Sequence, residues 1–253
     1  VTCTSKETIF RSKKYIFRLA DDKITVFHPT HSQFDVAFAV RDTIFTRDMG
    51  VGLVYMDGNQ MKKVKGGEFF ADVKINIFLP YDNKLLIGSR YDGIFLLQDG
   101  ELEVFETEAD DFLKKYKIYH GCLTYDGNFA FAAYTKGVVI LDKTGKQLLM
   151  LDEAAGLIDY QFLFVDMFDA NNLWVANGVG TSKVKVNSPL SYFDQRRGLI
   201  DVGSDIIRYK GIIYASTLRA LFKLQASEKG GQFYQFNTTD YNEIYSLDLL
   251  DDK

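Results

Sequence analysis

The sequence predicts an all-β protein that is built from a repeated four-stranded unit. Short runs rich in β-branched and aromatic residues recur along the whole chain, separated by turn clusters such as "MDGN", "QDGE" and "YDGN". Helical periodicity is confined to two short stretches, 109–117 and 151–157. The pattern of apolar runs and turns also repeats, at a spacing near 40 residues.

Five full copies of the repeat follow one another, with first strands expected to begin near Asp35, Val73, Ile118, Gln161 and Ser204. Successive starts are 38, 45, 43 and 43 residues apart, close to the roughly 40 to 45 residues of a four-stranded repeat. Each copy shows a strand, a polar turn, a strand that ends in small residues, a loop, a third strand, a tight turn and a fourth strand. Four antiparallel strands in each repeat predict the blades of a β-propeller.

The two ends of the chain look complementary. Residues 7–27 match the last three strands of a blade, and residues 243–249 match a first strand. We expect the two ends to share one blade and close the ring, which would leave no open sheet edge. The direct count is six blades, and a ring of seven is the alternative. The chain begins at Val1 without an initiator Met, so we interpret 1–253 as one propeller domain, excised from a longer protein.

Composition excludes several functional classes. Apolar residues make up 47% of the chain, enough for a substantial core. A net charge of −4 argues against nucleic-acid binding, and no apolar run reaches the roughly 18 to 20 residues of a membrane helix, so we expect no membrane contact by this segment. Cys3 and Cys122 lack metal-ligand spacing. We expect two unpaired thiols, no metal and no cofactor.

Glycines and aromatic residues recur at fixed places in the repeat. Gly93, Gly137 and Gly180 fall near the start of the third strand, where a tight return or close packing favours a residue without a side chain. The aromatic residues inside the strands are expected to pack between blades: Phe45, Phe78, Phe95, Phe131, Phe164, Trp174 and Phe222. These features explain the repeat without any catalytic role.

The stretches "DNKLLIGSRYDGIFLL" (82–97) and "DANNLWVANGVG" (169–180) resemble the D-x-x-G-x-LW-(I/V)-G-T-x-x-x-G-(L/I) repeat of the two-component-regulator propeller family. The chain departs from that pattern at "GVGTSKVKV" and at Ala220, which takes the glycine position. The resemblance implies an extracytoplasmic sensor segment of a hybrid histidine kinase or related regulator, usually with paired seven-bladed propellers. An incomplete part of such a two-propeller sensor is therefore another alternative to six blades.

The same resemblance implies a non-catalytic sensing module in the periplasm or on the extracellular face of a membrane-anchored protein. Its partners would be adjacent propeller or sensor domains of the same polypeptide, with a homodimer as a further option. A protein–protein interaction scaffold of the WD or kelch type is the main alternative, although the GH and WD dipeptides are absent.

Catalytic motifs are absent from the sequence. There is no G-x-S-x-G, no HExxH and no phosphate-cradling glycine loop. His28 and His31 in "HPTH" have no acidic partner fixed by spacing. Carboxylates such as Glu153, Asp166 and Asp169 could mimic a glycosidase pair, which leaves a polysaccharide-active enzyme as a weaker alternative.

A binding site is expected on the propeller face that carries the second-to-third-strand loops and the long blade-to-blade connections, because binding loops are drawn from long, irregular segments. Basic residues from several blades converge there and could pair with an oligosaccharide or other small anionic ligand. The alternative is that they are solvated turn residues beside acidic connections. The candidate ligand-binding residues are Lys13, Lys14, Arg47, Arg90, Tyr91, Tyr134, Lys136 and Arg219.

Overall fold

The structure is a computed structural model that describes residues 1–157, 164–186, 193–225, 231–237 and 244–248. It contains two compact units, Val1–Asn187 and Ser188–Lys253, which are described separately below. The predicted single domain over 1–253 stays a prediction.

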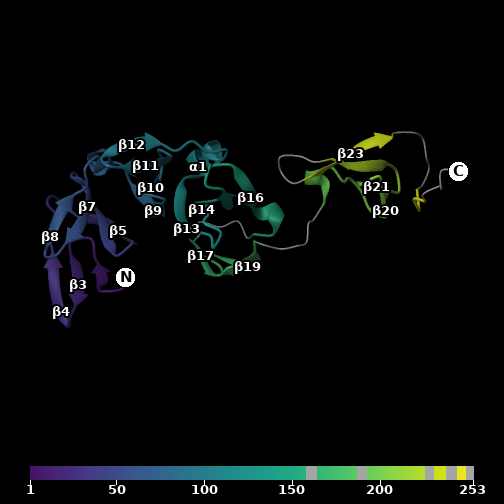
Figure 1. Cartoon of the computed structure of the whole chain (residues 1–253). Helices are drawn as coiled ribbons and strands as arrows, with labels where there is room; N and C mark the ends of the chain where they lie inside the picture. The colour runs from purple at the N-terminus through teal and green to yellow at the C-terminus, as the bar shows by residue number, and fades with distance from the viewer. Residues whose placement is uncertain (158–163, 187–192, 226–230, 238–243, 249–253) are drawn as a thin grey trace. The chain divides into compact units, whose positions relative to one another are not determined.

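The first unit holds five antiparallel sheets in which sequence neighbours pair (Figure 1). Four of these sheets have four strands, and the fifth has three strands within the described residues. In chain order, the sheets are β1 (Thr2–Cys3), β2 (Thr8–Arg11), β3 (Ile16–Ala20) and β4 (Lys23–Phe27); β5 (Phe34–Val40), β6 (Thr43–Asp48), β7 (Gly52–Asp57) and β8 (Gln60–Lys63); β9 (Ile75–Tyr81), β10 (Lys84–Ser89), β11 (Ile94–Gln98) and β12 (Glu101–Val104); β13 (Ile118–Leu123), β14 (Phe129–Ala133), β15 (Val138–Leu141) and β16 (Gln147–Leu151); and β17 (Phe164–Asp169), β18 (Asn172–Ala176) and β19 (Thr181–Lys185).

The second unit holds one four-stranded antiparallel sheet: β20 (Gly203–Tyr209), β21 (Ile212–Thr217), β22 (Leu221–Gln225) and β23 (Gln232–Asn237). The described chain thus contains six blade-sized sheets, which confirms the predicted all-β architecture of antiparallel four-stranded repeats. First strands begin at Phe34, Ile75, Ile118, Phe164 and Gly203. The predicted start near Gln161 lies outside the described residues, and the other four predicted starts agree within two residues.

The helical predictions are partly confirmed. Residues 109–117 contain α1 (Asp110–Tyr116), whereas 151–157 contain only the short 3-10 turn η2 (Glu153–Ala155). Two further 3-10 turns, η1 (Gly67–Ala71) and η3 (Gln195–Arg197), lie in connections where no helix is predicted. Single 3-10 turns are too short to leave a periodic signal in the sequence.

The N-terminal sheet differs from the prediction. Its first strand is β1, so this sheet has four strands from residues 1–27 alone. Residues 244–248 do not form the predicted strand; the backbone N–H of Ile244 donates to the carbonyl of Leu218 at 3.0 Å, and that of Leu247 donates to the Asp205 carboxylate at 2.7 Å. Closure of a ring by the two chain ends stays a prediction.

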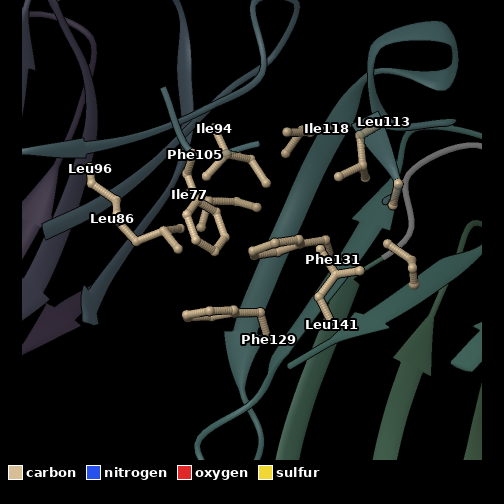
Figure 2. Packing of buried hydrophobic residues seen from close by; sticks show 12 residues of the cluster. Ile77, Leu86, Ile94, Leu96, Phe105, Leu113, Ile118, Phe129, Phe131 and Leu141 are labelled. Atoms are coloured by element: carbon tan, nitrogen blue, oxygen red, sulfur yellow. The ribbon is translucent and has the colours of Figure 1, made fainter. Parts of the chain in front are cut away.

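The core lies between successive sheets. Figure 2 shows Ile77, Ile94 and Phe105 from the third sheet and the residue after it facing Phe129 and Phe131 of the fourth sheet. Because successive side chains of a strand point to opposite faces, each inner strand can pack against both neighbouring sheets. Phe45, Phe78, Phe95 and Phe131 lie in or against such clusters, as predicted. Phe222 is buried in a cluster formed by the single sheet of the second unit and the connection before it, so its packing between blades stays a prediction. Phe164 also packs against the neighbouring sheet, where its ring contacts those of Tyr119 and His120 in β13, although 48% of the residue is exposed.

The third strand of the fourth sheet begins at a position that only glycine fits. Gly137 has φ +124°, and a Cβ there would lie 2.0 Å from the carbonyl oxygen of Leu151. The prediction for Gly137 is therefore confirmed. It is wrong for Gly180, where a Cβ would meet no described atom within 4 Å and φ is not in the left-handed region.

Candidate functional site

Two loops of the first unit carry the centre of the candidate site. Arg90 opens the β10–β11 loop, and its backbone N–H donates to the carbonyl of Lys74 at 2.8 Å. Tyr134 opens the β14–β15 loop, and its N–H donates to the carbonyls of Lys117 at 2.7 Å and Tyr116 at 3.1 Å. These bonds attach each loop to the connection that enters the same sheet, so the loop residues sit on a fixed backbone.

The side chains from these loops form a cluster of cations and aromatic rings. The Arg90 guanidinium carbon lies 5.1 Å from the centroid of the Tyr134 ring and 5.6 Å from that of Tyr91, and the Lys117 Nζ lies 5.5 Å from the Tyr91 centroid. We call Arg90, Tyr91, Lys117 and Tyr134 the Arg90 cluster. Tyr91 as a whole residue is 53% exposed, so the cluster is open to solvent.

The aromatic surface continues beyond the cluster. The Tyr119 ring centroid lies 5.6 Å from that of Tyr134 and 5.2 Å from that of Phe164. Phe164 is half-exposed, so this end of the aromatic surface is open to solvent. Aromatic faces therefore run from the third sheet to the fifth.

The charges of the Arg90 cluster are not neutralised by any described carboxylate. Neither Arg90 nor Lys117 forms an ion pair with a carboxylate in the described part of the chain. The Arg90 Nε is buried without a hydrogen-bond partner among the described atoms. Ring faces supply only a weak attraction to a guanidinium. The cluster can therefore still accept an anionic group at its exposed side.

A hollow of about 600 Å³ adjoins α1. Its aromatic wall is Phe112 and Tyr116, whose ring centroids are 5.2 Å apart. We call this hollow the α1 pocket; it is lined by Phe112, Tyr116, Lys136, Met150, Asp152 and Glu153. The structure therefore places the predicted site residue Lys136 in this pocket.

Arg47 is not available as a ligand-binding residue. It is 3% exposed, and its guanidinium donates to Asp35 Oδ2 at 2.9 Å and to the carbonyls of Phe70 at 2.7 Å and Ala71 at 2.8 Å. The side chain thus ties β6 to the start of β5 and to η1. The sequence prediction placed Arg47 on the open face because it lies next to a loop, whereas it still belongs to strand β6.

The other predicted residues remain exposed. Lys13 and Lys14 lie in the β2–β3 loop, and the Lys13 carbonyl accepts the N–H of Phe34 at 3.0 Å. Arg219 is exposed in the β21–β22 loop of the second unit. Of the predicted set, the structure brings Arg90, Tyr91 and Tyr134 together; a ligand-binding role for all the exposed residues stays a prediction.

Residues around α1 escaped the sequence prediction. Phe112 and Tyr116 are four positions apart and so share one face of the helix, and Lys117 follows with φ +66°, which turns the chain into β13. The mixture of aromatic and basic residues in "FLKKYK" is a sequence signal that could have identified this segment as part of the candidate site.

Three groups with shifted pKa values lie in strands of the fourth and fifth sheets: His120, Cys122 and Asp169. Burial raises the pKa of the Cys122 thiol to about 12, which keeps it protonated and a poor nucleophile. Burial also lowers the pKa of His120. Asp169 accepts hydrogen bonds from the Asn171 backbone and the Asn172 side chain. Among the described residues, no group of three His, Cys, Asp or Glu side chains could hold a metal ion.

No helix within the described residues is long and apolar enough to cross a membrane.

No protein-family model matches the chain. No curated protein matches it at a significant level. Solved structures do match. One is the extracellular domain assigned to a hybrid two-component system of B. thetaiotaomicron, with a TM-score of 0.56 and 13% identity over 97% of this chain. Another is the WD40 β-propeller domain of Doa1, with a TM-score of 0.51 and 11% identity over 98% of this chain and 84% of that one.

The fold is a β-propeller. At these identities the likeness shows the fold alone. The chain spans only 36% of the length of the matched extracellular domain.

Proposed function

We propose that this propeller is a non-catalytic sensing module of a signal-transduction receptor, and that it binds a small anionic or carbohydrate ligand at the Arg90 cluster. The observation that carries the proposal is the pair of cations without a described carboxylate partner, Arg90 and Lys117, held against the exposed ring of Tyr91.

The chemistry of the cluster fits an acidic sugar. A guanidinium can bind a carboxylate through two parallel hydrogen bonds, and a Lys ammonium adds a point charge beside it. The apolar C–H face of a sugar ring can stack on an aromatic ring such as that of Tyr91. The neutral thiol of Cys122 supports a binding role over a catalytic one.

The likeness to the extracellular domain of a two-component system supports a receptor segment on the outer side of a membrane. In such a receptor, adjacent propeller or sensor domains of the same polypeptide would be its partners, with a homodimer as a further option. The likeness to a WD40 domain supports a protein-interaction scaffold as the alternative.

The test is calorimetric titration with acidic and neutral oligosaccharides. Charge-assisted hydrogen bonds contribute roughly 1.5 to 3 kcal/mol, so Arg90→Ala should weaken binding of an acidic oligosaccharide about tenfold or more. Lys63→Ala is the matched control, because Lys63 is an exposed cation on β8. Arg219→Ala tests the predicted contribution of the second unit. Equal affinity of the wild type and Arg90→Ala would contradict the proposal.

A further inference from the structure

The Arg90 cluster and the α1 pocket are neighbouring features. Tyr116 lines the pocket, and the next residue, Lys117, belongs to the cluster. In the β14–β15 loop, Tyr134 belongs to the cluster and Lys136 lines the pocket. The N–H of Tyr134 bonds to the carbonyls of both Tyr116 and Lys117, so the two features share one backbone junction.

The pocket has a different chemistry from the cluster. Phe112, Tyr116 and Met150 form an apolar wall, whereas Asp152 and Glu153 supply carboxylate oxygens. Carboxylates accept hydrogen bonds from hydroxyl groups, and Lys136 can donate one. Predominantly apolar linings with a few polar groups are typical of small-molecule pockets of about 300 to 1,000 Å³.

We infer that the α1 pocket is a second subsite that takes an uncharged sugar unit of an oligosaccharide whose neighbouring acidic unit binds at the Arg90 cluster. The inference rests on the proposed function and narrows it to one ligand class, an oligosaccharide that contains both acidic and neutral units. The aromatic pair would stack on the sugar ring while Asp152 and Glu153 accept its hydroxyl groups.

Charge separates this ligand from an acidic one. An acidic unit in the pocket would face the carboxylates of Asp152 and Glu153, and like charges at close range repel. A neutral polyhydroxyl ring avoids this repulsion.

The test compares three tetrasaccharide probes by calorimetric titration of the 253-residue chain: one with alternating glucuronic acid and N-acetylglucosamine, one of galacturonic acid alone and one of N-acetylglucosamine alone. We expect the alternating probe to bind at least tenfold more tightly than either of the others. Equal affinity for the alternating and the all-acidic probes would overturn the inference, and failure of all three to bind would overturn it together with the proposed function.

Two variants separate the subsites. Glu153→Lys removes a carboxylate from the pocket and should strengthen binding of the all-acidic probe several-fold, a gain that misfolding cannot produce. Lys117→Ala should weaken both acidic probes and leave the neutral probe unchanged. If Lys117→Ala has this effect while Glu153→Lys changes no affinity, the proposed function stands and the second subsite is refuted.

Discussion

The guanidinium carbon of Arg90 lies 5.1 Å from the centroid of the Tyr134 ring, although the two residues come from loops of different sheets. The contact bridges the third and fourth sheets on their loop side. It therefore adds a second ring contact to the one that Tyr91 of the same loop makes at 5.6 Å, and restricts the orientation of the Arg90 side chain.

Removing the Tyr134 ring should release Arg90. A cation–π contact contributes roughly 0.5 to 2 kcal/mol, so Tyr134→Leu is expected to weaken binding of an acidic oligosaccharide about twofold to thirtyfold. Tyr134→Phe keeps the ring and should stay within about twofold of the wild type. Calorimetric titration of both variants checks this. Equal losses in the two would assign the effect to the hydroxyl instead.

Removing the Arg47 guanidinium should affect stability and not binding. Arg47→Ala removes the partner of Asp35 at 2.9 Å and the guanidinium donor of the Phe70 carbonyl, and leaves the Ala71 carbonyl with only the Gly50 N–H. Removal of one partner of a buried ion pair lowers the free energy of unfolding by about 3 to 5 kcal/mol. Urea denaturation should show this loss, while Arg219→Ala, at an exposed position, should change the free energy of unfolding by less than about 0.5 kcal/mol. A stable Arg47→Ala variant with weakened ligand binding would contradict the structural role.

The sequence predicted the repeat well because strand runs and turn clusters are local signals. The start of β13 at Ile118 and the glycine requirement at Gly137 both depend on nearby residues. The site was harder to predict, because the orientation of Arg47 into the core and the approach of Lys117 to Tyr91 depend on which connections fold over the sheet. From sequence position alone, Arg47 and Arg90 are both predicted to be exposed ligand-binding residues.

The two thiols should differ in reactivity. Cys122 is buried and its pKa is raised to about 12, whereas Cys3 is exposed. At pH 8 a thiol reagent should label one equivalent in the native protein and two in denaturant. Cys3→Ser should leave no rapidly labelled thiol. Fast native labelling of Cys122 in that variant would show that the thiol is accessible.

The same burial predicts a decline in stability at alkaline pH. Burial raises the pKa of Cys122 from its ordinary value of 9.0 in the unfolded chain to about 12 in the folded state. Between these values the folded state keeps a proton that the unfolded state has lost, so the free energy of unfolding falls as pH rises from about 9 to about 12. Denaturation series at pH 8 and pH 10 should show a smaller decline in Cys122→Ala than in the wild type. An identical decline would remove Cys122 as a cause.

Gly137→Ala should destabilise the protein more than a glycine replacement elsewhere. The new Cβ would lie 2.0 Å from the carbonyl oxygen of Leu151, at a φ of +124° that L residues rarely adopt. Strain and overpacking together should cost about 2 to 5 kcal/mol. Gly58→Ala is the matched control, because its φ is +57° and a Cβ would meet no described atom within 4 Å, which leaves only a conformational cost of about 1 to 2 kcal/mol. Urea midpoints of the two variants measure the difference. Equal midpoints would mean that β15 and β16 can move apart at Leu151 without cost, and that Gly137 is not required by the close approach of these two strands.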